Sequence, residues 1–325
     1  MNKTPGSKKF FSSKSFALII VLILIIVAFG ILNPNFLKYA NLRNIMYSTS
    51  LAGIICVGVC CVLISGNADL SVGAVGCMGG IICGFCLRAN IPWVISVVIT
   101  LMFGASAGII NALLLNKLKI PPFIGTLAMT SVWQGVGNLM TSNVNIPITN
   151  TSFSNVGAAN IFLIPLPFII MLVLMSIYGI MLSSSEFGRR IYMIGGNRQA
   201  ARLAGINPEK MNIILFLNCS AVSAFSGAIL AARMRTASPL AVQGTQFTAI
   251  TALVLGGVAF GGGSGGMFGG FIGLLLLNTF NNGLMLIGLG SYWQIAASGV
   301  LLVLALTVDY FNERARRVKF SGHTV

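Results

Sequence analysis

Long apolar runs separated by short polar stretches make up nearly the whole chain. Most of these runs are about 17 to 25 residues long, which is the length that a helix rising 1.5 Å per residue needs to cross a hydrocarbon layer. The pattern predicts an all-α integral membrane protein with about ten transmembrane helices, folded as a single domain over residues 1–325. The predicted spans are 16–32, 41–64, 70–87, 92–115, 120–140, 161–182, 211–231, 247–260, 267–287 and 292–310.

The charged residues orient these spans. Only 8% of the residues are charged, and the formal net charge is +15. If the spans alternate in direction, 15 of the 20 Lys and Arg residues fall on the side where the first span begins. Cytoplasmic loops carry the excess of basic residues, so the bias predicts that both termini and segment 183–210 are cytoplasmic. Membrane orientation explains this charge better than nucleic-acid binding, because the basic residues are dispersed at segment ends.

Segment 183–210 is the one interior stretch too polar and too basic to lie in hydrocarbon. Its residues predict a short helix over 198–204, with Asn197 as the N-cap, Gly205 as the C-terminal stop and Pro208 just beyond. A helix of about seven residues is marginal in water, because nucleation is costly without packing. This favours docking against another molecule.

The two faces of this short helix differ in chemistry. Ala200, Leu203 and Ala204 share one face at i, i+3, i+4 spacing, and Arg198 and Arg202 share another. One interpretation is a contact site for a cytoplasmic partner. The other is a solvated loop whose arginines only maintain the membrane orientation.

The sequence SGNADLSVGAVG, at 65–76, contains Asp69, the first acidic residue of the chain. A carboxylate at membrane depth costs about 2.5 to 3.5 kcal/mol on insertion scales. The flanking Gly66, Gly73 and Gly76 allow a helix break or close helix approach. Asp69 therefore either faces a cavity on a solute pathway or caps the helix that begins near Leu70.

Two stripes of amide side chains lie within predicted spans. One is Asn278, Asn281 and Asn282, and the other is Gln134 and Asn138. Amides offer both donors and acceptors, which suits a neutral polyhydroxylated solute better than an ion. Alternatively, and with equal support from the sequence, these amides form hydrogen bonds between packed helices and do not contact a solute.

Neither the glycines nor the cysteines indicate a cofactor or metal in this chain. The GGGSGG sequence at 261–266 lacks the Lys-Ser or Lys-Thr of a nucleotide-binding P-loop. Cys83 and Cys86 are surrounded by apolar residues with no His nearby, so all seven cysteines are interpreted as buried small hydrophobes. No metal site and no disulfide are predicted.

Four segments in this order resemble one known family. They are SGNADLSVGAVG (65–76), KLKIPPFIGTLAM (117–129), GRRIYMIGGNRQAARLAGIN (188–207) and the glycine- and asparagine-rich stretch 252–294. Together they resemble the membrane permease subunits of bacterial ABC importers for ribose and other monosaccharides, a group that also includes permeases for a furanose-like signal. The resemblance covers nearly the whole chain.

The resemblance implies a type II ABC importer permease fold, with ten helices in two inverted halves, in the bacterial cytoplasmic (inner) membrane. It implies a second permease subunit, identical or paralogous, two cytoplasmic ATPase subunits that take ATP and Mg²⁺, and an extracytoplasmic sugar-binding protein. The implied coupling helix to the ATPase comprises Gly196, Asn197, Arg198, Gln199, Ala200, Ala201, Arg202, Leu203, Ala204 and Gly205. The candidate translocation pathway comprises Asn67, Asp69, Ser71, Gln134, Asn138, Asn278, Asn281 and Asn282.

The leading hypothesis is therefore a non-enzymatic permease for a neutral sugar, with hydrolysis in a separate subunit. A stand-alone secondary transporter or channel for a small polar solute is the alternative, although the scarcity of intramembrane ionisable residues disfavours it. A membrane enzyme would need a nucleophile with a base, or a metal cluster, and the sequence shows neither.

Overall fold

The computed structural model describes residues 13–321, which are mostly helical. A helix lies at each of the ten predicted ranges, and the all-α prediction is confirmed apart from four strands of two residues each. The ten helices are α1 (Ser13–Leu32), α2 (Tyr39–Ile64), α3 (Val72–Arg88), α4 (Trp93–Leu118), α5 (Pro122–Thr141), α7 (Leu166–Ser184), α10 (Pro208–Met234), α11 (Thr245–Leu255), α12 (Met267–Leu286) and α13 (Ser291–Ser321).

Within the described residues, five helices are long and apolar enough to cross a membrane, namely α2, α4, α7, α10 and α12. Shorter apolar stretches lie in α1, α3, α11 and α13. The prediction for 247–260 needs correction, because α11 has only 11 residues and ends at Leu255. It reaches about 16 Å, roughly half of a hydrocarbon layer. The helix stops because Gly256 and Gly257 follow, the latter with a φ of 88°.

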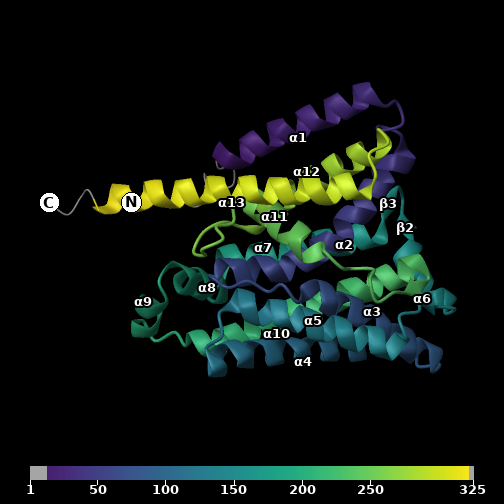
Figure 1. Ribbon diagram of the computed structural model, residues 1–325, viewed down its shortest axis with the longest axis horizontal. Coiled ribbons are helices and arrows are strands. Elements are labelled where there is room, and N and C mark those ends of the chain that lie inside the picture. The colour runs from purple at the N-terminus through teal and green to yellow at the C-terminus, as the bar shows by residue number, and fades with distance from the viewer. Residues whose placement is uncertain (1–12, 322–325) are drawn as a thin grey trace, which may run out of the picture.

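Helices α2 and α10 pack against each other and connect most of the other helices (Figure 1). α10 also packs against α3 and α4, whereas α2 packs against α7, α11 and α12. Small residues permit this packing: a Cβ added at Gly58 of α2 would lie 2.6 Å from the Cα of Cys219 in α10. The backbones of the central helices are therefore in direct contact.

The two ends of the molecule are built differently. At one end, α7 leads into α8 (Glu186–Gly196) and α9 (Arg198–Leu203) (Figure 1). At the other, β1 (Ile146–Pro147) pairs antiparallel with β4 (Thr236–Ala237), and α6 (Thr151–Ala158) leads to the hairpin of β2 (Asn160–Ile161) and β3 (Ile164–Pro165). Both ends are short connecting structures on a long helical body.

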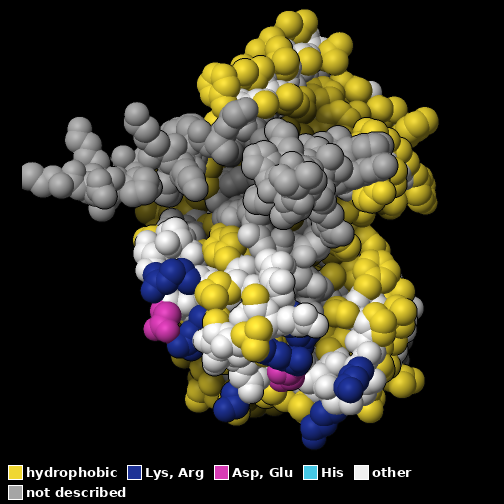
Figure 2. Space-filling model, turned by 90° about the vertical axis from the view of Figure 1, so that its left-hand side faces the viewer, with side chains coloured by type: hydrophobic (Ala, Val, Ile, Leu, Met, Phe, Trp, Pro, Cys, Tyr) yellow, Lys and Arg dark blue, Asp and Glu magenta, His cyan; other side chains and the backbone are white. Residues whose placement is uncertain are grey.

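Basic side chains gather at the α8–α9 end, while apolar side chains cover the adjacent flanks (Figure 2). This end carries the end of α4 with Lys117, the α8 arginines Arg189 and Arg190, and the start of α10 with Lys210. The basic side chains before residue 16 and after residue 310 were also counted for the predicted orientation, and they lie outside the described side chains.

Candidate functional site

Asp69 lies in the irregular segment 65–71 between α2 and α3, and its side chain is fully buried. Its Oδ1 accepts hydrogen bonds from the Ser71 backbone N–H at 2.9 Å and from the Ser71 hydroxyl at 2.6 Å. The Ser71 hydroxyl in turn accepts a hydrogen bond from Asn111 Nδ2 of α4 at 2.8 Å. Helix α3 begins at Val72, so Asp69 stabilises the turn before the helix rather than capping the N–H groups within it. Asp69 Oδ2 has no hydrogen-bond partner among the described residues.

Threonines of α5 stabilise the non-helical backbone of segment 65–71. The Leu70 N–H donates to Thr126 Oγ1 at 3.1 Å, and the Thr130 hydroxyl donates to the Leu70 carbonyl at 3.0 Å. Irregular backbone at membrane depth is tolerated where protein groups satisfy its hydrogen bonds. Because these threonines supply the partners that a helix would have supplied, the break before α3 can lie inside the helical body.

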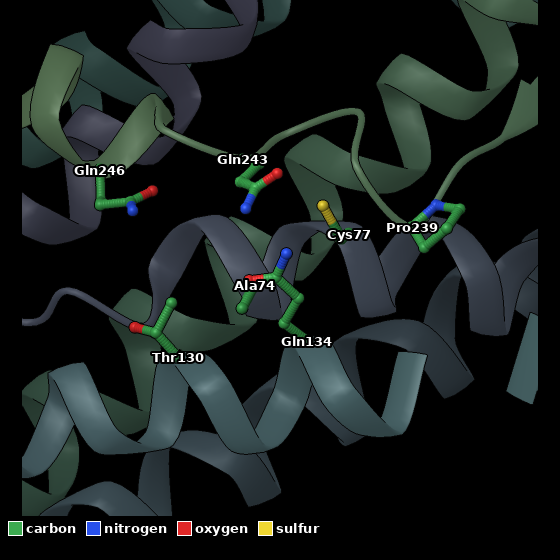
Figure 3. A pocket seen from close by; sticks show the side chains of 7 residues that line it. All are labelled: Ala74, Cys77, Thr130, Gln134, Pro239, Gln243 and Gln246. Atoms are coloured by element: carbon green, nitrogen blue, oxygen red, sulfur yellow. The ribbon is translucent and has the colours of Figure 1, made fainter. Parts of the chain in front are cut away.

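Gln134 lies in a small pocket that was not apparent from the sequence (Figure 3). The pocket is lined by Ala74, Cys77, Thr130, Gln134, Pro239, Gln243 and Gln246. These residues come from α3, α5, α11 and the loop before α11. None of the seven is charged, so the pocket offers amide and hydroxyl groups in an otherwise apolar setting.

The asparagine stripe of α12 makes contacts elsewhere. Asn278 Nδ2 donates to the Leu274 carbonyl of its own helix at 2.9 Å. Asn281 Nδ2 donates to the Ser298 hydroxyl of α13 at 3.4 Å, and Asn282 Oδ1 accepts from Asn41 Nδ2 of α2 at 2.8 Å. Two of the three thus connect helices, which is the packing alternative, and their part in a pathway stays a prediction.

The part of Asn138 in a pathway also stays a prediction. This residue of α5, one turn beyond Gln134, is half-buried and does not line the pocket. In the described part of the chain, its buried Oδ1 has no hydrogen-bond partner.

The predicted short helix in segment 183–210 is confirmed as α9, and it ends one residue earlier than expected. Asn197 is its N-cap: Oδ1 accepts hydrogen bonds from the N–H groups of Gln199 and Ala200, both at 3.0 Å. Gly205 follows with a φ of 80°, as a C-terminal stop requires. Leu203 is 91% exposed at the tip of this element. Contact of this helix with a cytoplasmic partner stays a prediction.

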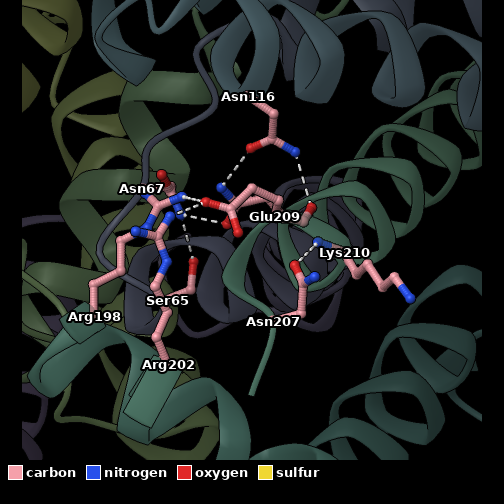
Figure 4. A network of polar contacts seen from close by, with 9 residues as sticks. Ser65, Asn67, Asn116, Arg198, Arg202, Asn207, Glu209 and Lys210 are labelled. Carbon is pink, nitrogen blue, oxygen red and sulfur yellow. Dashed lines mark hydrogen bonds and ion pairs between the residues drawn. The ribbon is translucent and has the colours of Figure 1, made fainter. Parts of the chain in front are cut away.

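Glu209, at the start of α10, holds the two α9 arginines (Figure 4). Its Oε1 pairs with Arg198 at 3.3 Å and also with Arg202. These pairs are partly exposed, so each contributes little to stability, on the order of 0 to 1 kcal/mol. Their effect is to fix the position of α9 against α10.

A chain of hydrogen bonds connects this ion-pair cluster with the buried segment 65–71 (Figure 4). Asn116 of α4 donates to the Glu209 carbonyl at 2.8 Å and accepts from Asn212 of α10 at 3.1 Å. Asn212 accepts from Asn67 at 3.1 Å. The chain therefore runs from α9 through α10 and α4 to Asn67, two residues before Asp69.

Glycines form a second junction between α8 and the same segment. The Gly263 N–H, in the loop between α11 and α12, donates to the Ile64 carbonyl at the end of α2 at 2.8 Å. A Cβ added at Gly195 of α8 would overlap the Ile64 carbonyl oxygen. The Tyr192 hydroxyl donates to the Gly265 carbonyl at 2.7 Å, and burial, together with the nearby Cys60 and Cys61, raises the pKa of Tyr192 to about 12. Tyr192 is therefore a neutral donor at physiological pH.

The family model described as the permease component of the branched-chain amino acid transport system matches residues 41–306. The chain belongs to this permease family. The permease is similar to the ribose import permease protein RbsC of Bacillus subtilis, with 34% identity over 290 residues, 89% of this chain and 90% of the relative. It is 35% identical to RbsC of Escherichia coli over 90% of this chain and 92% of the relative, and 32% identical to the L-arabinose transport system permease protein AraH over 93% and 92%. No solved structure matches the chain.

Membership confirms the predicted class. The protein is a transport permease of the bacterial cytoplasmic (inner) membrane and not an enzyme. The predictions about individual residues of the permease are not tested by these similarities.

Several residues that shape the site escaped the sequence analysis. Gln243 and Gln246 lie outside the predicted stripes and in the connection just before the predicted span 247–260. Asn116 and Asn212 were isolated amides near span ends. A polar residue inside an apolar span was the available signal, but it does not say which residues meet.

Proposed function

We propose that the permease is the membrane subunit of an ATP-driven ABC importer and provides the translocation pathway for a neutral, ribose-like monosaccharide. The names of the relatives support the solute class, because they are a ribose import permease and an L-arabinose transport permease. The pocket chemistry agrees with it, since uncharged amides suit hydroxyl groups that both donate and accept hydrogen bonds.

In this proposal, ten helices form the type II permease fold, with the α8–α9 end in the cytoplasm. α9 is the coupling helix and contacts an ATPase subunit, which takes ATP and Mg²⁺. The permease itself takes no cofactor. A second permease copy, identical or paralogous, completes the pathway, and an extracytoplasmic binding protein delivers the sugar at the β1–β4 end.

The observation that carries the proposal is the connection between an exposed docking element and a buried polar segment. On α9, Leu203 is exposed at the surface of the protein, and Glu209 pairs with Arg202. From the Glu209 carbonyl, hydrogen bonds continue through Asn116 and Asn212 to Asn67. A rigid-body displacement of α9 would therefore reach the break before α3. This arrangement suits transmission of nucleotide-driven movement better than it suits a solvated loop.

The test is reconstitution of the permease with its ATPase in proteoliposomes, with the binding protein on the sugar side. We expect ATP-dependent uptake of D-ribose or L-arabinose and none of L-leucine. Leu203→Asp should lower uptake and ATPase stimulation by the loaded binding protein more than tenfold, because a charge replaces the apolar contact, while Leu203→Met stays within about twofold.

Three results would contradict parts of the proposal. Uptake by the purified permease without ATP would identify a stand-alone transporter or channel. Uptake of L-leucine in place of the sugars would refute the solute class. Equal stimulation of Leu203→Asp and wild type, with both proteins folded by size-exclusion chromatography, would remove the coupling role of α9.

A further inference from the structure

Two helices that each follow a non-helical segment begin at the same place inside the permease. α3 starts at Val72 and α11 at Thr245, and each follows an irregular segment. A Cβ added at Gly73 would overlap Gln246 Oε1 and would lie 3.1 Å from the Val242 carbonyl oxygen. The first turns of the two helices are therefore in contact.

From this meeting point the two helices run toward opposite ends of the molecule. α3 leads toward β1 and β4, because Gly84 lies against Ile146 and Ala237. α11 leads toward the α8 end, because the loop that follows it binds Ile64 through Gly263. Half-helices that meet within a membrane protein commonly form solute sites there, since their ends expose backbone dipoles and their breaks leave room for side chains.

Three carboxamides converge on this point (Figure 3). Gln246 comes from the first turn of α11, Gln243 from the loop before it, and Gln134 from α5. Gln134 is twelve residues from the start of α5 and seven from its end, so the point lies near the middle of that helix. Each carboxamide supplies donors and an acceptor to the same small space.

Gln246 is the most buried of the three. Its residue is 6% exposed, and its Oε1 has no hydrogen-bond partner within the described residues. Leaving a buried acceptor without a partner costs about 1 to 3 kcal/mol, so such groups usually have a further role. A hydroxyl that enters the pocket would remove this cost.

The pocket in this conformation holds about one water molecule, so a sugar does not fit without movement. No charged side chain lines it, which disfavours a zwitterion or an ion, because burying a charge without a partner is costly. Pro239, Gln243 and Gln246 stand on the α11 side, opposite Thr130 and Gln134 of α5. Separation of these two sides would open the space.

We propose that Gln134, Gln243 and Gln246 form a constriction whose carboxamides bind the hydroxyl groups of the solute as it passes. The inference rests on the proposed function, and it assigns the solute contact to the meeting point of α3 and α11. Gln246 is the central contact, because its acceptor is already buried and without a partner. The stripe of Asn278, Asn281 and Asn282 is outside this contact.

The test compares Gln246→Leu and Gln134→Leu with Gln294→Leu in the reconstituted importer. Gln294 of α13 is also half-buried, with a buried Nε2 that has no partner in the described part of the chain, but it does not line the pocket. We measure ATP-driven uptake of D-ribose and L-arabinose and of the matching 2-deoxy sugars. Loss of one hydrogen bond to a hydroxyl should lower the uptake of the sugar about tenfold in the two pocket variants, and Gln294→Leu should stay within about twofold.

The deoxy sugars separate a solute contact from a purely structural role. Wild type should prefer the full sugar over at least one deoxy analogue, and Gln246→Leu should lose that preference, since the contact is then already missing. If both pocket variants carry the sugars and their analogues like wild type, the inference is overturned while the proposed function stands. The same conclusion follows if uptake falls but the preference is unchanged. If wild type carries no sugar, the proposed function fails, and this inference fails with it.

Discussion

At the scale of single residues, glycines decide how closely the helices of the permease can pack. Gly227 of α10 lies against the backbone of α3, and a Cβ there would overlap the Gly76 carbonyl oxygen. Gly135 of α5 is different, because an added Cβ would meet nothing within 4 Å. Both are glycines within apolar helices, and only the neighbouring helix distinguishes them. Glycine at such contacts lets helix backbones approach closely.

The first prediction uses this pair. Gly227→Ala should destabilise the permease by about 1 to 3 kcal/mol, because the new methyl group forces α10 and α3 apart. Gly135→Ala should be neutral or stabilising by up to about 1 kcal/mol, since alanine is the better helix former. Thermal unfolding in detergent, followed by far-ultraviolet circular dichroism, measures both. Equal unfolding temperatures for the two variants would contradict the contact.

At the scale of elements, α9 illustrates how local rules and tertiary contacts combine. The cap at Asn197 and the stop at Gly205 follow from local chemistry and were predicted from the sequence. The placement of the helix is a tertiary matter, because Glu209 holds Arg198 and Arg202 only once α10 folds beside them. A six-residue helix is too short to persist alone, so its position depends on tertiary contacts, namely the buried Ala201 and these ion pairs.

The second prediction concerns this anchoring. Glu209→Gln removes the charge that both arginines share, so the amide hydrogens of residues 198–204 should exchange about threefold to tenfold faster. Glu186→Gln is the matched control, because Glu186 pairs only with Arg190 on the exposed surface of α8 among the described contacts. Hydrogen-exchange mass spectrometry measures both variants. If Glu209→Gln leaves exchange in α9 unchanged, the ion pairs do not hold the helix.

At the scale of the whole molecule, the permease has two chemically distinct ends. The α8–α9 end is rich in Lys and Arg (Figure 2), and the opposite end carries the β2–β3 hairpin, whose Phe162 is 96% exposed. Alternating spans with the basic end in the cytoplasm predict that this hairpin lies outside. The seven cysteines are free thiols, six buried and Cys86 half-buried, so native labelling by a polar reagent should be weak.

The third prediction tests this orientation. Phe162→Cys should react with a membrane-impermeant maleimide in spheroplasts. Leu203→Cys should react only in inside-out vesicles or after permeabilisation. Wild type provides the background in each preparation. Labelling of both variants from the same side would show that an odd number of crossings has been miscounted between them.

The sequence alone determined the class of this protein, the positions of its apolar helices and the caps of α9, because hydrophobic run length and capping chemistry act over a few neighbouring residues. Tertiary structure decided which polar side chains meet. Gln134, Gln243 and Gln246 come from distant segments and line one pocket, whereas Asn282 accepts a hydrogen bond from Asn41 of α2. It also decided that α11 ends after 11 residues and reaches only about half of a hydrocarbon layer, since the glycines after Leu255 turn the chain toward Ile64. The physical reason is that an apolar span has the same hydropathy on every face, and only packing against its neighbours selects the face on which a lone amide finds its partner.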